Sequence, residues 1–184
     1  MKFRVPSKWV DEAKIRSTEG GLNRRSMAGD NPDAQIAGHL GEFSFAKAMN
    51  NCGIRFRHID VTETYDYDFL VGSKRIDVKT KVRGNNGRSV PCKQDYTCDV
   101  PEYQANVCDS YVFASWDKEG EEIYLMSGCK QERFKAKAEL KKAGVRFEGR
   151  LLQSDLLVAR YCDFTEFDEY IDLLHLYSTR AGIA

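Results

Sequence analysis

The sequence predicts an α/β fold of the mixed α+β kind, in which helices flank one central mixed β-sheet. Residues 33–51 and 164–177 have the apolar spacing of helices. Residues 65–82, 111–116 and 122–126 are rich in β-branched and aromatic side chains. Helices, then strands, then helices are typical of a single sheet covered by helices. With 184 residues, the whole chain is expected to form one domain.

The N-terminal part, residues 1–31, is expected to form a short helix and a flexible loop. Ser7 is a capping residue before a helix over residues 8–17, and the polar, glycine-rich residues that follow predict the loop. Pro32 and Asp33 then mark the start of the helix over 33–51, which Gly53 ends as a C-cap.

The helix over 33–51 carries small and ionisable residues at neighbouring positions. Gly38 and Gly41 would let another backbone or a ligand approach closely. His39 and Glu42 are three residues apart, so they are neighbours on the helix surface. Apolar residues flank Glu42, which predicts that it is partly buried beside a site.

Residues 65–71 and 74–82 predict a β-hairpin around the turn Gly72-Ser73. In this register Leu70 faces Arg75 and Asp68 faces Asp77, and facing residues point to the same side of the sheet. One face then carries the polar side chains of Asp66, Asp68, Asp77 and Lys79, and the other carries the apolar Tyr67, Phe69, Ile76 and Val78. A three-residue turn, 72–74, would instead put the two aspartates on opposite faces.

The pair Asp68 and Asp77 has two interpretations. Like charges that face each other destabilise a sheet by up to ~1 kcal/mol, but a divalent cation between them makes the arrangement favourable. Mg²⁺ is commonly held by one or two carboxylates together with phosphate oxygens and water. Lys79, two residues beyond Asp77, adds a positive charge that suits a phosphate or an activated water. The alternative is a solvated hairpin face on which charges only promote solubility.

The second half of the chain begins with a segment that looks irregular. Residues 83–108 contain glycines, asparagines and two prolines, and predict a long irregular insertion. Residues 111–116 and 122–126 predict two antiparallel strands. Residues 131–143 predict an amphipathic helix that ends at Gly144, with Leu140 facing inward.

Composition narrows the function classes. The chain has 28 Lys and Arg against 28 Asp and Glu, so a nucleic-acid site would have to be a local basic patch. No apolar run has the ~20 residues of a membrane span, and no signal peptide is recognised. The cysteines form no C-x-x-C pair, which favours free thiols in a cytoplasmic protein. A zinc site remains an alternative, with ligands from the group Cys92, Cys98, Cys108 and Cys129.

The set of Glu42 on a helix, Asp68 on a strand and Asp77-Val78-Lys79 on the next strand resembles the PD-(D/E)xK nuclease superfamily, which has the restriction-endonuclease-like fold. The helix reads GHLGEFSFAKAMN, which looks like the G-x-x-G-E opening of many such enzymes. The resemblance covers about residues 33–128. Tyr67 stands where the family name has proline, and Asp77 stands where glutamate is commoner.

The resemblance implies a Mg²⁺- or Mn²⁺-dependent hydrolysis of phosphodiester bonds, most often in DNA. Asp68, Asp77 and the main-chain carbonyl of Val78 would bind the metal, and Asp66 is an alternative to Asp68. Glu42 would orient the metal's water shell or help to hold a second ion. Lys79 would position the attacking water, so the implied catalytic set is Glu42, Asp68, Asp77 and Lys79.

DNA is therefore the expected partner, with a homodimer as an open assembly state and no membrane contact. By the same analogy the setting is the cytoplasm of a bacterial or phage-infected cell. The candidate phosphate-binding cations lie near the predicted site or in the N-terminal loop: Arg24, Arg25, Lys81, Arg83, Arg88 and Lys93. The alternative function is a nucleic-acid- or protein-binding module that keeps the fold without turnover.

Overall fold

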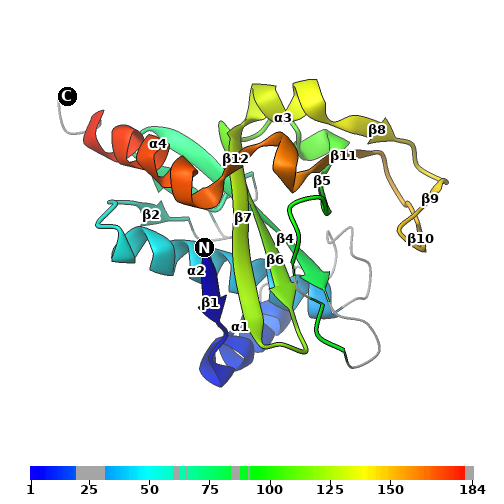
Figure 1. The fold of residues 1–184 in the computed structure, drawn as a ribbon, viewed down its shortest axis with the longest axis horizontal. Helices are drawn as coiled ribbons and strands as arrows, with labels where there is room; N and C mark the ends of the chain where they lie inside the picture. Colours follow the sequence, from blue (N-terminus) through cyan, green and yellow to red (C-terminus); the bar gives the residue numbers. More distant parts are fainter. Residues whose placement is uncertain (20–31, 60–62, 65, 84–87, 91, 181–184) are drawn as a thin grey trace.

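The computed structural model describes residues 1–184 except 20–31, 60–62, 65, 84–87, 91 and 181–184. The fold is mixed α+β, as the sequence predicts, with a curled mixed sheet and four α-helices in the described ranges. Strands β1, β7, β6 and β4 run side by side, and α2 lies across the far side of the sheet (Figure 1).

The main sheet has the strand order β1-β7-β6-β4-β3-β2, and β12 pairs with β7 beside this path. β4 and β6 are parallel, whereas the other neighbours are antiparallel. The strand bounds are β1 Lys2–Arg4, β2 Arg57–His58, β3 Phe69–Val71, β4 Lys74–Arg83, β6 Ser110–Asp117, β7 Glu122–Lys130 and β12 Thr165–Glu166. The predicted strands around 111–116 and 122–126 are thus confirmed as the antiparallel pair β6 and β7.

Helices α2 (Pro32–Asn51) and α4 (Phe167–Arg180) cover one face of this sheet. Phe45 of α2 and Phe167 of α4 meet Phe69, Val78 and the neighbouring strand residues in one buried cluster. Residues of this face alternate along β4 and β6 with those of the other face, as the period of two requires. Gly53 has a φ of +67° just after α2, which agrees with its predicted role as C-cap.

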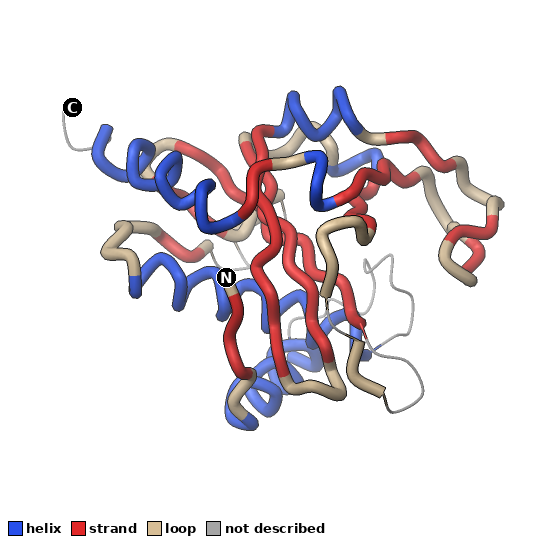
Figure 2. Tube along the Cα trace, viewed as in Figure 1, coloured by secondary structure: helices blue, strands red, loops and turns tan. Residues whose placement is uncertain are grey.

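The opposite face is covered by α3 (Gln131–Lys137) and by a small sheet in which β11 (Leu156–Arg160) lies between β5 (Thr97–Pro101) and β8 (Glu139–Lys141). Tyr111 and Phe113 of β6 pack there against Phe134 of α3 and Val100 of β5. Helix α1 (Ser7–Glu19) packs against α2 in a third cluster that includes Trp116. Figure 2 shows the small sheet and α3 beside one end of the long strands.

The prediction of an irregular insertion over 83–108 is wrong at Arg83 and over residues 97–104. β4 extends to Arg83, β5 spans Thr97–Pro101, and the 3-10 helix η2 spans Glu102–Gln104. The buried Cys98 and Val100 alternate with less buried residues, which is the pattern of a strand. The main-chain groups of this stretch find hydrogen-bond partners by pairing with β11 (Leu156–Arg160). The nearby glycine and proline residues concealed this short alternation.

The predicted helix over 131–143 is also too long. α3 ends at Lys137, and β8 (Glu139–Lys141) follows it as a strand paired with β11. Leu140 is 41% exposed, so it does not face inward as predicted. β9 (Arg146–Phe147) and β10 (Arg150–Leu151) then form a separate hairpin, and η3 (Tyr161–Asp163) precedes β12 and α4. Pairing with β11 overrides the local helix propensity here.

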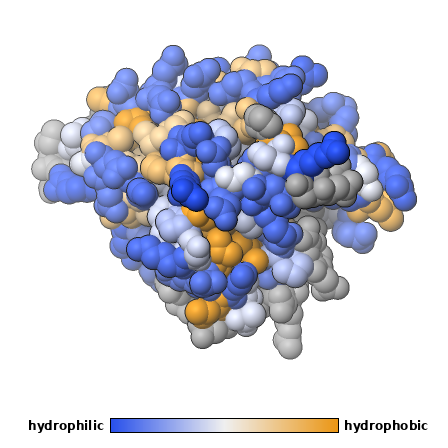
Figure 3. Space-filling view, turned by 60° about the horizontal axis from the view of Figure 1, so that its bottom comes forward, coloured by the Kyte–Doolittle hydropathy of each residue, from blue (hydrophilic) through white to orange (hydrophobic). Residues whose placement is uncertain are grey.

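Among the described residues, no helix is long and apolar enough to cross a membrane. The face of the molecule seen in Figure 3 is mostly hydrophilic, with hydrophobic residues in groups between the hydrophilic ones.

Candidate functional site

The hairpin register brings Asp68 next to β4, as predicted. β3 and β4 pair Val71 with Lys74, Leu70 with Arg75 and Phe69 with Ile76, and Gly72 has a φ of +60°. The two-residue turn is therefore confirmed, and the three-residue alternative is excluded. Gly72 stands at a position that other residues rarely tolerate.

At Asp68, one residue before β3, a side chain takes over part of the hydrogen bonding to β4. The Asp68 main-chain N–H donates to the Ile76 carbonyl at 3.0 Å, and its carboxylate accepts the Val78 N–H at 2.7 Å. The Asp68 side chain thus replaces a strand as the partner of Val78. Because β3 begins only at Phe69, Tyr67 packs on the α3 side of the sheet and not beside Phe69, contrary to prediction.

Asp77 and Lys79 lie on the same face of β4 and form an ion pair. The Lys79 Nζ lies 2.9 Å from Asp77 Oδ2, and their side chains are 24% and 6% exposed. Lys79 also donates to the Gln104 Oε1 of η2 at 3.0 Å. Burial disfavours the charged ammonium, but Asp77 and Asp68 raise the pKa of Lys79 above its ordinary value. Lys79 therefore stays positive in a site with little water.

Glu42 reaches the same region from α2. This helix approaches β4 closely, because a Cβ on Gly41 would lie 1.9 Å from the Thr80 Oγ1. The predicted close approach is thus confirmed at Gly41, whereas a Cβ on Gly38 would meet nothing within 4 Å. Glycine at position 41 therefore sets how near Glu42 can come to the strand.

Two histidines hold the Glu42 carboxylate. His39 Nδ1 lies 3.5 Å from one carboxylate oxygen, and His58 Nε2 lies 3.1 Å from the other. Burial alone would raise the pKa of Glu42, but the hydrogen bonds and charges of the two histidines lower it to about 2. His58 is fixed in turn by stacking on Phe69, with 4.7 Å between the ring centroids. Glu42 is consequently an anion over the ordinary pH range.

The surroundings of Asp68 disfavour its ionised form. Burial and then the charges of Glu42 and Asp77 raise its pKa well above the ordinary aspartate value. The Lys79 charge and the Val78 N–H oppose that rise without cancelling it. Asp68 thus faces two negative groups, Glu42 and Asp77, with Lys79 as the opposing positive charge, and a bound cation would relieve the remaining repulsion.

The donors do not form a closed cage. Within the described ranges, no group of three or more His, Cys, Asp or Glu side chains is arranged to hold a metal ion. The arrangement instead offers the carboxylates of Asp68 and Asp77 and the nearby main chain of Val78. Asp66, the alternative to Asp68, is exposed, and its main-chain N–H donates to the Thr64 hydroxyl oxygen at 3.1 Å.

The predicted phosphate-binding cations lie in different surroundings. Lys81 contacts Asp99 at 2.5 Å and Glu148 at 2.9 Å. Arg83 donates to the Thr97 carbonyl at 3.1 Å and stacks over Tyr96. The remaining predicted cations divide into exposed ones, Arg88 and Lys93, and ones outside the described residues, Arg24 and Arg25.

The cysteines proposed as zinc ligands are spread through the α3 side of the core. Cys98, Cys108 and Cys129 are buried in the cluster around Phe113, and Cys92 packs against its edge. Burial, with a smaller contribution from Asp77, raises the pKa of Cys108 to about 12, so it is a neutral thiol. All six cysteines are unpaired.

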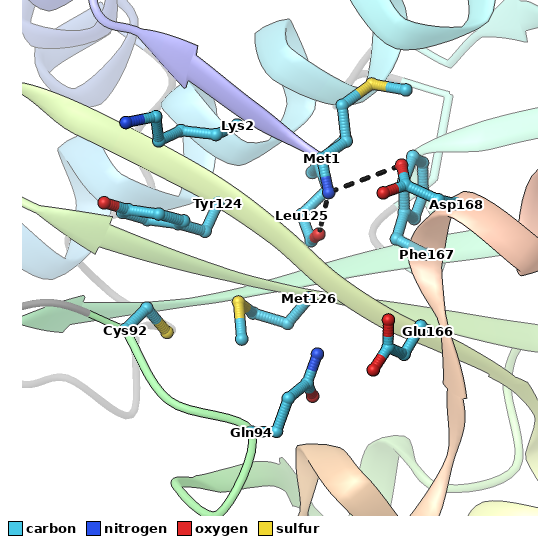
Figure 4. A pocket seen from close by; sticks show the side chains of 10 residues that line it. All are labelled: Met1, Lys2, Cys92, Gln94, Tyr124, Leu125, Met126, Glu166, Phe167 and Asp168. Carbon is cyan, nitrogen blue, oxygen red and sulfur yellow. Dashed lines mark hydrogen bonds and ion pairs between the residues drawn. The ribbon is translucent and has the colours of Figure 1, made fainter.

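A pocket of about 380 Å³ lies elsewhere, beside β1 and β7. Figure 4 shows the Met1 amino group between the Leu125 carbonyl and the Asp168 carboxylate, at 3.1 and 3.5 Å. None of the acidic or basic residues of the β3–β4 hairpin lines it. This pocket is therefore separate from the candidate site.

Sequence reasoning missed two residues of the site. His58 lies on a two-residue strand within residues 54–59, IRFRHI, whose alternation of apolar and basic residues is compatible with a strand but indicates no partner for Glu42. Gln104 lies in η2, far from Lys79 in sequence, and no motif marks it.

No protein-family model matches the sequence, and no curated protein matches it significantly.

Proposed function

We propose that this protein is a metal-dependent nuclease that hydrolyses phosphodiester bonds in DNA, on a restriction-endonuclease-like fold. The observation that carries the proposal is the meeting of Asp68, Asp77 and Lys79 at one end of the β3–β4 hairpin, with Glu42 close enough to raise the pKa of Asp68. A buried cluster of acids around one lysine has little value for stability alone, and perturbed titration of this kind is concentrated at functional sites.

The order of the elements supports the same proposal. Helix α2 with Glu42 precedes the sheet, Asp68 adjoins β3, and Asp77-Val78-Lys79 lies on the adjacent β4. β6 and β7 extend the sheet beyond β4. This order agrees with the PD-(D/E)xK resemblance of the sequence over residues 33–128.

The chemistry of the donors fits Mg²⁺ or Mn²⁺. Hard carboxylate and carbonyl oxygens are available from Asp68, Asp77 and Val78, and Mg²⁺ commonly takes one or two carboxylates while water and phosphate fill its other positions. A cation would also relieve the repulsion that raises the pKa of Asp68. When bound, such an ion polarises the phosphate and lowers the pKa of a bound water.

The protein's own groups then have distinct tasks. Lys79, kept positive by the aspartates, orients the attacking water and offsets the negative charge that grows on the phosphate. Gln104 fixes the position of the Lys79 ammonium. Glu42, kept ionised by His39 and His58, orients water at the site and does not need to bind the metal directly.

A binding module without turnover is the second candidate, and one observation favours it. Asp77 is paired with Lys79, and Glu42 is paired with His39 and His58, so these charges already have partners within the chain. Under this alternative the protein binds nucleic acid or a protein in a salt-sensitive way without cleavage.

The cytoplasm is the compartment we propose. The six unpaired cysteines are the usual state of thiols in a reducing compartment.

The test is cleavage of plasmid DNA, single-stranded DNA and RNA in Mg²⁺, Mn²⁺ or EDTA. The wild type should cleave DNA only with a divalent metal, and Asp77→Asn and Lys79→Ala should each lose cleavage while keeping the circular dichroism spectrum. Lys74→Ala, on the same strand but at the turn, is the matched control and should retain activity. Undiminished cleavage by both site variants, or no cleavage by the wild type under any metal, rules the nuclease out.

A further inference from the structure

Residues 130–150, which we name the basic arm, carry a strong local charge on a neutral protein. They contain eight Lys and Arg against three Asp and Glu, whereas the chain as a whole has 28 of each kind. Most of these cations are exposed: Lys130, Arg133, Lys135, Lys137, Lys142, Arg146 and Arg150. A concentration of this kind is what a local nucleic-acid patch requires when the net charge is zero.

The arm begins with Lys130 of β7 and with α3, which packs on the main sheet, and its remaining strands pair outside that sheet. After α3, β8 pairs only with β11, and β9 pairs only with β10 among the described strands. Figure 1 shows β8, β9 and β10 reaching to one extremity of the molecule, away from α1 and β1. Leu140, Val145 and Leu151 are 41%, 47% and 55% exposed. The arm therefore presents an extended strip of side chains to the outside.

Several charges of the arm are available to a ligand. Lys130, Lys137 and Arg146 have no acidic side chain within 4 Å in the described part of the chain. Lys142 lies 2.7 Å from Asp155, with side chains that are 67% and 32% exposed, and a pair this accessible to water contributes little stability, so phosphate oxygens can compete for Lys142. Arg150 lies 3.5 Å from Asp99, whose side chain is only 16% exposed.

The tip of the arm returns to the strand that carries the candidate site. Glu148 and Gly149 form the β9–β10 turn, with φ values of +48° and +79°. The Glu148 carboxylate contacts Lys81 Nζ at 2.9 Å, and the Phe147 ring lies 5.8 Å from the same nitrogen. Lys81 follows Asp77 and Lys79 on one face of β4, so the arm adjoins this face.

We propose that the basic arm is the surface along which the phosphate backbone of duplex DNA binds on its way to the site at Asp68, Asp77 and Lys79. The inference deepens the proposed function by naming its binding surface. Exposed cations that follow one another along α3, β8 and the β9–β10 hairpin suit a polymer with evenly spaced phosphates, and the tip of the hairpin adjoins a site suited to one phosphate.

The test is binding of a fluorescein-labelled DNA duplex, followed by anisotropy in EDTA across a series of KCl concentrations. The arm variant combines Lys130→Gln, Lys137→Gln and Arg146→Gln, the three cations without an acidic partner. The control variant combines Arg4→Gln, Lys8→Gln and Lys14→Gln, which removes the same charge from β1 and α1.

The arm variant should bind about tenfold more weakly or worse at moderate salt, and its plot of log K against log salt should flatten by about 2–3. The control variant should bind like the wild type. Equal weakening by both variants would mean that only net charge matters, and wild-type affinity in the arm variant would mean that DNA binds elsewhere. Either result overturns the inference, as does arm-dependent binding to anionic lipid vesicles without binding to DNA.

This experiment is independent of the cleavage test. Arm-dependent DNA binding by a protein that never cleaves would support the arm and refute the nuclease. Metal-dependent cleavage with arm-independent binding would refute the arm and leave the nuclease in place.

Discussion

Replacement of Lys79 by methionine perturbs the buried charges of the site most directly. Lys79 is the one ion-pair partner of Asp77 in the described part of the chain, and the Asp77 side chain is only 6% exposed. Removal of one member of a buried pair typically costs ~3–5 kcal/mol, because the other charge is left without compensation. The Lys79 side chain is 24% exposed, so water replaces part of the lost interaction, and we expect a loss of about 2–3 kcal/mol.

The measurement is the free energy of unfolding in urea at pH 7 with EDTA. In a domain of this size each kcal/mol corresponds to about 2–4 °C, so the melting temperature should fall by about 4–12 °C. Lys74→Met, at the turn of the same hairpin, is the control and should change stability by less than about 0.5 kcal/mol. The double variant Asp77→Asn, Lys79→Met should recover about 1 kcal/mol or more of the loss. If Lys79→Met costs no more than the control, or if the two changes are additive, the ion pair has been misjudged.

Three further predictions concern the surroundings of this pair. Because the pKa of Asp68 is raised in the folded protein, its ionisation opposes folding as pH rises above the ordinary aspartate range. Asp68→Asn should therefore stabilise the metal-free protein more at pH 7 than at pH 3.5. An equal effect at both pH values would contradict this. The lowered pKa of Glu42 has the opposite sign. Stability from Glu42 is present above about pH 4.5 and lost toward pH 2, and His58→Ala should reduce that acid-sensitive part in urea titrations, whereas an unchanged pH profile would count against the contact. Gly41→Ala should lower the free energy of unfolding by about 1–3 kcal/mol through overpacking against Thr80, and the better helix propensity of alanine offsets about 1 kcal/mol of that loss. Adding Thr80→Ala should remove the overpacking. A Gly41→Ala protein more stable than the wild type would show that the helix can shift.

The sequence predicted what depends on local patterns. The register around Gly72 followed from turn chemistry and strand alternation, and it brought Asp68 beside β4. The helix with Glu42 followed from its apolar spacing and its caps. These features are settled by residues close together in the chain, where short-range physics is sufficient.

Features that depend on distant pairing could not be predicted. β5 and β8 are strands because each pairs with β11. In the sequence, the turn residues before β5 and the helix propensity before β8 are stronger signals than the strand propensity of these two short segments. The contacts of His58 with Glu42 and of Gln104 with Lys79 join elements that only the folded sheet brings together. The partners that tune the site are thus less visible in sequence than its acidic residues.

The most direct test of the central claim is the position of Mn²⁺ in crystals soaked with manganese, located by its anomalous scattering. We expect one ion bonded to the carboxylates of Asp68 and Asp77 and to the Val78 carbonyl, and no ion there in Asp77→Asn crystals. Manganese bound only elsewhere, or at this place in both proteins alike, would contradict the claim that the β3–β4 hairpin is a metal site.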